Sequence, residues 1–130
     1  MQIDVFNGDA DGLCALLQLR LAKPCKSQLV TGIKRDINLL DDVKAHADDE
    51  ITVLDISLAT NRLAVDRLLS VGAKIFYVDH HQSGDIPEHK NLKTIINTDA
   101  NICTSLLVND YLEGKYRAWA VTAAFGDNMF

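Results

Sequence analysis

Acidic and histidine side chains that can bind metal ions occur in four short stretches of this sequence. The stretches read Asn-Gly-Asp-Ala-Asp-Gly at 7–12, Val-Leu-Asp at 53–55, Asp-His-His at 79–81 and Gly-Asp-Asn at 126–128. Carboxylates brought together without a counter-charge raise one another's pKa and cost several kcal/mol, and divalent cations remove that cost. Carboxylate mixed with imidazole suits Mn²⁺, Fe²⁺, Co²⁺ or Zn²⁺, whereas an all-oxygen set suits Mg²⁺ or Ca²⁺. The residue types therefore predict a divalent-metal centre.

The spacing of the acids allows two ions. Asp9 and Asp11 can each bind a different ion, and Asp55 can bridge ions about 3.5–4 Å apart. Such a pair suits hydrolysis of phosphoryl esters, because one ion binds a phosphate oxygen and the other produces hydroxide from water. A simpler interpretation stays open, in which Asp9 and Asp11 only cap the helix that follows them.

The apolar pattern predicts the elements that must position these residues. We expect strands over 3–6, 29–33, 51–56, 74–78 and 94–97, and helices over 12–21, 60–71, 102–112 and 116–125. The first helix is expected to bury a stripe formed by Leu13, Leu16, Leu17 and Leu21. Asp36 is expected to cap a further helix with Leu39, Leu40 and Val43 as its apolar positions.

Strands and helices that alternate in this way predict an α/β fold, a three-layer α/β/α domain with a mostly parallel sheet of about five strands. Ligands of such sheets gather at the carboxyl ends of the strands, where three of the four polar stretches fall. Lys34 and Arg35 follow the second strand and are expected near the same rim, where they could bind a substrate phosphate or remain a solvated loop pair.

Length and composition exclude several classes of protein. The chain has 130 residues, of which 48% are apolar, as expected for one folded domain. It contains no apolar run near ~20 residues and its start has no basic region, so we expect no membrane span, no signal peptide and a cytoplasmic location. The net charge of −5 argues against a generic nucleic-acid coat protein. The three cysteines form no C-x-x-C pair, which argues against a structural zinc site or a disulfide framework.

Taken in order, the four stretches resemble the catalytic domain of the DHH phosphoesterase superfamily. That superfamily includes RecJ-type exonucleases, nano-RNases, cyclic-dinucleotide phosphodiesterases, exopolyphosphatases and family II pyrophosphatases. The resemblance spans 1–130 as a single catalytic domain and implies a phosphoesterase with two ions, preferably Mn²⁺, with Mg²⁺ or Co²⁺ as substitutes. The family's usual C-terminal substrate-binding domain is absent from this sequence, and apolar surface left without it would favour a homodimer.

The resemblance also implies roles for individual residues. Asp9 and Asp55 would bind one ion, and the second would be bound by Asp11, Asp55, His80 and Asp127. His81 would act with Asp55 in catalysis, at the substrate phosphate or at the metals. Asp79 would orient the histidine pair, and Asn7 would be a weak ligand. Thr104 and Ser105 match the Ser/Thr helix start that often follows the fifth strand in this family.

Two positions depart from the pattern of the family. Many members have a histidine where this chain has Val5, and exonuclease-like members have an acid where it has Asn7. The first metal site is therefore expected to be the weaker one. The surroundings of Asn7 are more similar to the exonuclease-like branch, so the expected substrate is a short single-stranded oligonucleotide or a dinucleotide, or else a related phosphoanhydride.

Three other interpretations compete with a phosphoesterase. One is a receiver domain, a phosphoacceptor signalling module in which Asp55 would be phosphorylated. A receiver, however, has Ser or Thr where this chain has 79–81, and Lys where it has Thr98-Asp99. Another is a catalytically incomplete fragment of a DHH protein. The last is an EF-hand calcium loop at 7–18, which would need Glu where Gln18 stands.

Overall fold

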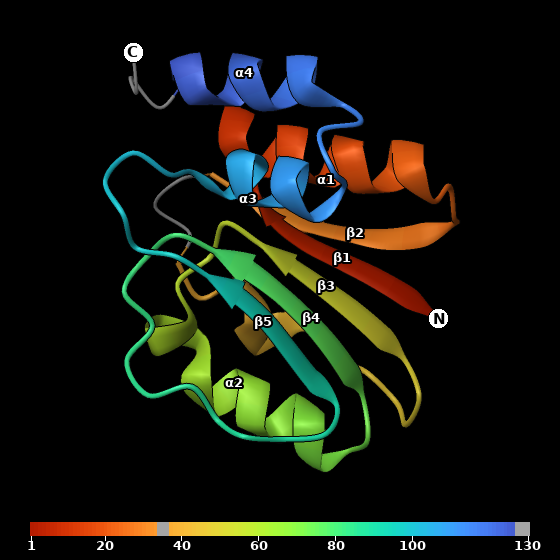
Figure 1. Cartoon of the computed structure of the whole chain (residues 1–130). Helices are drawn as coiled ribbons and strands as arrows, with labels where there is room; N and C mark the ends of the chain where they lie inside the picture. The colour runs from red at the N-terminus through yellow and green to blue at the C-terminus, as the bar shows by residue number, and fades with distance from the viewer. Residues whose placement is uncertain (34–36, 127–130) are drawn as a thin grey trace.

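Five parallel strands form one twisted sheet in the computed structural model, which describes residues 1–33 and 37–126 (Figure 1). Their order across the sheet is β2-β1-β3-β4-β5, and every neighbouring pair is parallel. The strands are β1 (Gln2–Asn7), β2 (Ser27–Gly32), β3 (Glu50–Leu54), β4 (Lys74–Asp79) and β5 (Leu92–Ile96). The expected α/β class and the five-stranded parallel sheet are therefore confirmed, with strand ends shifted by one or two residues.

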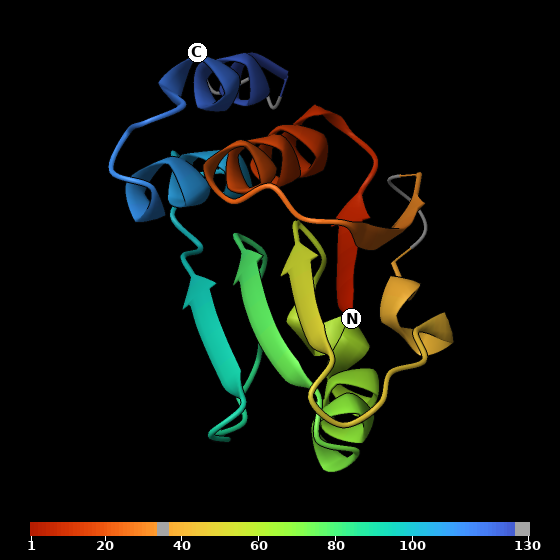
Figure 2. The same ribbon diagram turned by 90° about the vertical axis from the view of Figure 1, so that its right-hand side faces the viewer.

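Helices cover both faces of the sheet in three layers. On one side lie α1 (Ala10–Ala22) and α3 (Thr104–Tyr111), with α4 (Arg117–Gly126) packed outside them (Figure 2). On the other side lie α2 (Leu58–Ser70) and a short 3-10 turn, η1 (Leu39–Asp42). Among the described residues, no helix is both long enough and apolar enough to cross a membrane.

The alternation of side chains along the strands produces two apolar cores. Ile3, Val5 and Tyr77 belong to the core shared with α2 and η1, whereas Phe6 and Val78 belong to the core beneath α1 and α3. The hydroxyl of buried Tyr77 donates a hydrogen bond of 2.6 Å to the backbone oxygen of Ile56, so its polar end has a partner. Because β1, β3 and β4 are buried on both faces over most of their length, their sequences are nearly continuous apolar runs.

The buried face of α1 differs from the predicted leucine stripe. Leu13 and Leu21 are 52% and 43% exposed, while Leu16 is buried as expected. Ala15 and Gln18 are buried in their place. Leucines occur on every side of this helix, so their spacing does not select one face. Its rotation is instead fixed by packing against the sheet, α3 and α4.

The helix expected after position 36 is wrong as well, and only η1 forms there; Asp36 itself lies outside the described residues. Side chains of α2 bind the backbone of this segment. Asn61 accepts a hydrogen bond from the amide of Leu40 at 3.2 Å, and Arg67 donates to the backbone oxygens of Leu40 and Val43 at 3.2 and 2.9 Å. These bonds satisfy polar backbone groups that a longer helix would otherwise have paired.

A buried carboxylate, Asp4 of β1, holds α1 against this strand through hydrogen bonds from Arg20. It accepts two hydrogen bonds from Arg20, at 2.7 and 2.8 Å, and one each from Ser27 and Gln2 at 2.7 and 2.9 Å. Burial acts to raise the pKa of Asp4, but these hydrogen bonds outweigh burial and hold the pKa below its usual 3.8. The carboxylate therefore stays ionised inside the protein.

We expect the Arg20→Ala variant to lose about 3 kcal/mol of unfolding free energy, because it leaves the Asp4 charge buried without its main partner. Urea denaturation at pH 7 measures this loss. The control is Asp66→Ala, which removes only the partner of Arg62 in an exposed ion pair and should change stability by less than about 0.5 kcal/mol. Because the pKa of Asp4 is lowered by folding, its stabilisation is present above pH 4 and is lost as the pH falls further. Equal losses in both variants would contradict this role of Asp4.

Candidate metal centre

Three of the four polar stretches meet at the carboxyl edge of the sheet, as the parallel order requires. Asp9 and Asp11 follow β1, Asp55 follows β3, and the run 79–81 comes at the end of β4. The beginning of α3 joins them from above the sheet. Asp127, Lys34 and Arg35, the remaining predicted site residues, lie outside the described residues.

His80 lies between two acids of this edge. Its Nε2 atom is 3.0 Å from Oδ1 of Asp55 and 3.6 Å from Oδ2 of Asp11. Thr104 donates a hydrogen bond from its hydroxyl to the same oxygen of Asp55 at 3.2 Å. Asp11 and Asp55 are buried, so little water reaches their charges. One imidazole therefore brings together carboxylates that lie 44 residues apart in the sequence.

A second acid–histidine pair lies beside the first. Nδ1 of His81 is 2.6 Å from Oδ1 of Asp79, and the rings of His80 and His81 are 4.4 Å apart. Asp79 is fully buried, yet its other oxygen, Oδ2, has no hydrogen-bond partner. Asp55, Asp79, His80 and His81 each offer one ligand atom, and all four atoms lie within 4.8 Å of one another. This donor set, with one buried carboxylate oxygen unsatisfied, fits a divalent cation.

The backbone at Asp55 adopts an uncommon conformation. Its φ angle is +64°, in the left-handed region, which Asp tolerates better than most residues. Its amide still donates a hydrogen bond of 3.1 Å to the backbone oxygen of Val78, so the residue remains tied to β4. Backbone strain of this kind is common where a side chain must be held for function.

Asp9 and Asp11 also act as helix caps. The carboxylate of Asp9 accepts a 3.0 Å hydrogen bond from the amide of Gly12 and caps α1. Asp11 instead caps α3, because its two oxygens accept hydrogen bonds from the amides of Thr104 and Ser105 at 3.1 and 2.7 Å. A carboxylate oxygen has two lone pairs, so capping leaves acceptor capacity for an ion. Helix capping and metal binding are thus compatible for both residues, although Asp11 caps α3 and not the helix that follows it.

Gly12 is required where α1 begins. A Cβ atom at this position would lie 2.0 Å from the backbone oxygen of Asn7, a contact that no side chain can make. The side-chain oxygen of Asn7 accepts a hydrogen bond of 3.3 Å from the amide of Asp9. The loop is therefore folded back tightly onto the end of β1, which holds Asp9 and Asp11 at the rim.

The acids and histidines of this site shift one another's pKa values. Burial and the charges of Asp11 and Asp9 raise the pKa of Asp55 to about 8, although His80 opposes the shift. The hydrogen bond to Asp55 raises the pKa of His80 to about 9, against burial. The hydrogen bond to Asp79 likewise raises the pKa of His81. The site therefore retains protons at neutral pH in the place where a cation would supply positive charge.

Sequence reasoning missed the contacts of α3 and part of the role of Asp79. Thr104 and Ser105 were expected only as a helix start, yet they bind Asp55 and Asp11 from about 50 and 94 residues away. The Thr-Ser pair after the fifth strand was the available signal, but its spacing does not identify its partners. Asp79 was expected to orient both histidines; it contacts His81, while Asp55 holds His80.

Replacing Thr104 by Val is expected to weaken Mn²⁺ binding about tenfold, because the hydroxyl that orients Asp55 is lost while the side chain keeps its shape. Isothermal titration with Mn²⁺ measures the affinity. Thr122→Val is the matched control, since the Thr122 hydroxyl contacts only the backbone oxygen of Ala118 on an exposed helix face. Unchanged affinity in Thr104→Val would show that this contact does not support the ion.

The chain was compared with models of known protein families, and none matches it. No curated protein matches it either. The geometry of the candidate metal centre, rather than a relative, therefore has to support a proposal about function.

Proposed function

We propose that this protein is a divalent-metal-dependent phosphoesterase of the DHH type that hydrolyses phosphodiester bonds of short oligonucleotides or dinucleotides. The supporting observation is the group formed by Asp55, Asp79, His80 and His81, whose ligand atoms lie within 4.8 Å of one another at the carboxyl edge of a parallel sheet. The mixed oxygen and nitrogen donors favour Mn²⁺ or a similar ion. Asp9, Asp11 and Asp127 are the further ligands that we propose for a two-ion centre.

Bound divalent ions supply Lewis acidity and a water molecule of lowered pKa. The residues of the chain then have separable tasks. Asp55 and His80 would hold an ion, and Thr104 orients Asp55 through its hydroxyl. Asp79 engages Nδ1 of His81 through Oδ1, and its unpartnered Oδ2 is the atom that it would offer to an ion. Nε2 of the exposed His81 ring would then meet the substrate and not the ion. The hydrogen bond to Asp79 raises the pKa of His81, which favours the protonated ring that donation to the leaving oxygen requires.

An assay panel tests this function. It combines a chromogenic phosphodiester, a dinucleotide, pyrophosphate and a short single strand with Mn²⁺, Mg²⁺ or EDTA. We expect hydrolysis of the diester and the dinucleotide with Mn²⁺, slower hydrolysis with Mg²⁺ and none with EDTA. Activity that persists in EDTA would contradict a metal mechanism. No hydrolysis with any metal would favour the catalytically incomplete alternative.

A receiver-like signalling module is the second candidate, because the order of the strands favours it. The order β2-β1-β3-β4-β5 is that of the flavodoxin-like folds, which include receivers, and Asp55 follows β3. Against it, Asp55 is only 2% exposed and is paired with His80. Incubation with acetyl phosphate separates the two functions, since a receiver would be phosphorylated on Asp55 and a phosphoesterase would not.

A further inference from the structure

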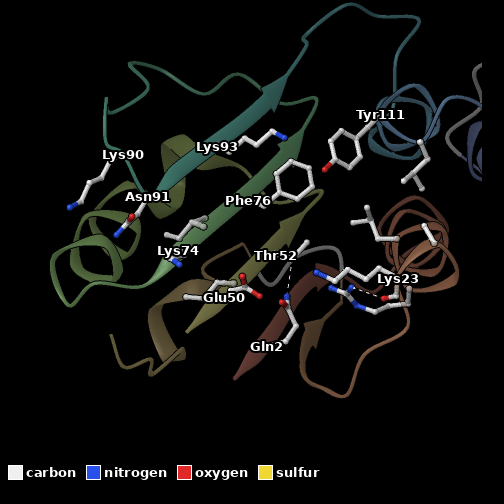
Figure 3. A pocket seen from close by; sticks show the side chains of 16 residues that line it. Gln2, Lys23, Glu50, Thr52, Lys74, Phe76, Lys90, Asn91, Lys93 and Tyr111 are labelled. Carbon is white, nitrogen blue, oxygen red and sulfur yellow. Dashed lines mark hydrogen bonds between the residues drawn. The ribbon is translucent and has the colours of Figure 1, made fainter. Parts of the chain in front are cut away.

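A groove of about 560 Å³ opens on the sheet face that carries α1 and α3, at the amino ends of the strands (Figure 3). On this face, Phe6, Leu54 and Val78 are covered by α1 and α3. Residues earlier on the same strands, such as Thr52 and Phe76, line the groove instead. Parallel sheets are normally covered on both faces, so this open half is unusual. The metal centre lies at the opposite, carboxyl edge.

The groove is basic although the protein is acidic. Four of its lining residues are lysines, namely Lys23, Lys74, Lys90 and Lys93, whereas the chain as a whole carries a net charge of −5. Glu50 and Arg20 also line it, but Arg20 is neutralised by its pair with Asp4. Figure 3 shows the lysines on different sides of the groove; Lys23 directly follows α1, Lys74 lies on β4, Lys93 lies on β5, and Lys90 lies in the loop before β5. Charges spread in this way suit a ligand with several negative groups.

Two aromatic rings lie within the groove. The ring centroids of Phe76 and Tyr111 are 5.1 Å apart, at an angle of 43°. The ammonium group of Lys93 lies 5.4 Å from the centre of the first ring and 4.9 Å from the centre of the second. Tyr111 is 45% exposed, so a face of its ring is accessible to a ligand. Nucleic-acid bases stack on accessible aromatic rings with little preference for sequence.

We propose that this groove binds a short single-stranded oligonucleotide at a second site, separate from the metal centre. The lysines contact phosphates, and the Phe76–Tyr111 pair stacks with a base. An acidic peptide would use the lysines but not the rings, so the aromatic pair favours nucleic acid. The volume lies within the range of roughly 300–1,000 Å³ of small-ligand sites, which suits one or two nucleotides held inside it, with the adjacent phosphates of the strand contacting the lysines around it. This site needs neither bound metal nor hydrolysis, so it stands apart from the proposed enzyme activity.

Fluorescence anisotropy of an end-labelled hexanucleotide tests the proposal, with EDTA present so that no metal-dependent cleavage occurs. We expect binding at low salt that weakens as salt is added, with a slope of log K against log[salt] of about −2 to −3 for three or four phosphate contacts. The Lys74→Ala/Lys93→Ala double variant should bind at least tenfold more weakly, with a slope about 1.4 units shallower. Lys44→Ala, which removes an exposed lysine outside the groove, should bind like wild type.

The contribution of the aromatic ring is measured separately. Tyr111→Leu should weaken binding about tenfold without changing the salt slope, because the variant keeps an apolar side chain but loses the stacking face. Tyr111→Phe, which retains a ring, should bind like wild type. Circular dichroism shows whether each variant is folded. If Tyr111→Leu binds as tightly as wild type, base stacking on this ring is wrong.

Four results would overturn the proposal. The first is no binding at low salt, and the second is equal binding by the wild type and the lysine double variant. The third is equal competition by a glutamate peptide of matched charge, which would make the groove a site for acidic polypeptides. The fourth is loss of binding in Asp55→Asn, which would place the oligonucleotide at the candidate metal centre. Failure of the hydrolysis assays leaves all of these measurements interpretable.

Discussion

Hydrolysis of a chromogenic phosphodiester with Mn²⁺ is expected to fall by at least about 1,000-fold when Asp55 is replaced by Asn. An amide has no negative charge to hold a divalent ion, and Asp55 is the acid closest to His80, at 3.0 Å. His80→Ala should lose activity to a similar degree, because it removes a nitrogen ligand and breaks the same pair. Initial rates at saturating Mn²⁺ measure both effects.

Loss of activity in Asp55→Asn reports on catalysis, because this substitution is not expected to unfold the protein. Folding raises the pKa of Asp55 to about 8, so the fold favours an uncharged group at this position. The matched controls are Asp66→Asn and His46→Ala, which change exposed residues outside the site and should retain full activity. Hydrolysis that survives both Asp55→Asn and His80→Ala would place the chemistry elsewhere.

Added Mn²⁺ is expected to raise the melting temperature, and to raise it more at pH 8 than at pH 6. A cation that binds only the folded state stabilises it by about 2.7 kcal/mol at 100 times its Kd, which corresponds to a shift on the order of 10 °C for a domain of this size. The ion has to displace protons from Asp55 and His80, so its apparent affinity rises with pH. Melting curves in EDTA and in Mn²⁺ at the two pH values measure the difference.

In EDTA, the melting temperature itself should fall as the pH rises, whereas the shift caused by Mn²⁺ grows. Folding raises the pKa of Asp55 from 3.8 to about 8 and that of His80 from 6.5 to about 9, so the folded chain binds more protons than the unfolded chain between these limits. Stability therefore declines as the pH rises, and the contribution of His80, present below pH 6.5, is lost by about pH 9.

Asp55→Asn should show little stabilisation by Mn²⁺. An equal shift in this variant would contradict the assigned ligands.

The fold could be predicted because its strands are strongly apolar and its connections contain helices. Runs such as 51–54 and 75–78 are short, rich in β-branched and aromatic residues, and typical of largely buried strands, and parallel order then brings their carboxyl ends together. The rotation of α1 could not be predicted, because Leu13 and Leu16 are equally apolar and only tertiary packing distinguishes them. The length of η1 depends on Asn61 and Arg67 of another helix, which no local pattern reveals.

The candidate site was predictable in its location but not in its internal contacts. Acids after β1 and β3 and histidines after β4 had to share a rim, whichever role each one has. The positive φ of Asp55 and the capping of α3 by Asp11 arise from contacts between distant segments. The contact of Thr104 with Asp55 is also one between distant segments. A hydroxyl at a helix start has many possible partners, and the sequence alone does not identify which one it binds.

The outer position of α4 determines what optical probes report. This helix packs on α1 and α3 through small side chains, Ala120, Ala123 and Ala124, so it can detach without opening either apolar core. The sole tryptophan of the chain, Trp119, belongs to α4 and is 42% exposed. Tryptophan fluorescence therefore reports on the detachment of this one helix, whereas far-ultraviolet circular dichroism reports on unfolding of the whole chain. A two-state analysis of unfolding needs the circular dichroism signal.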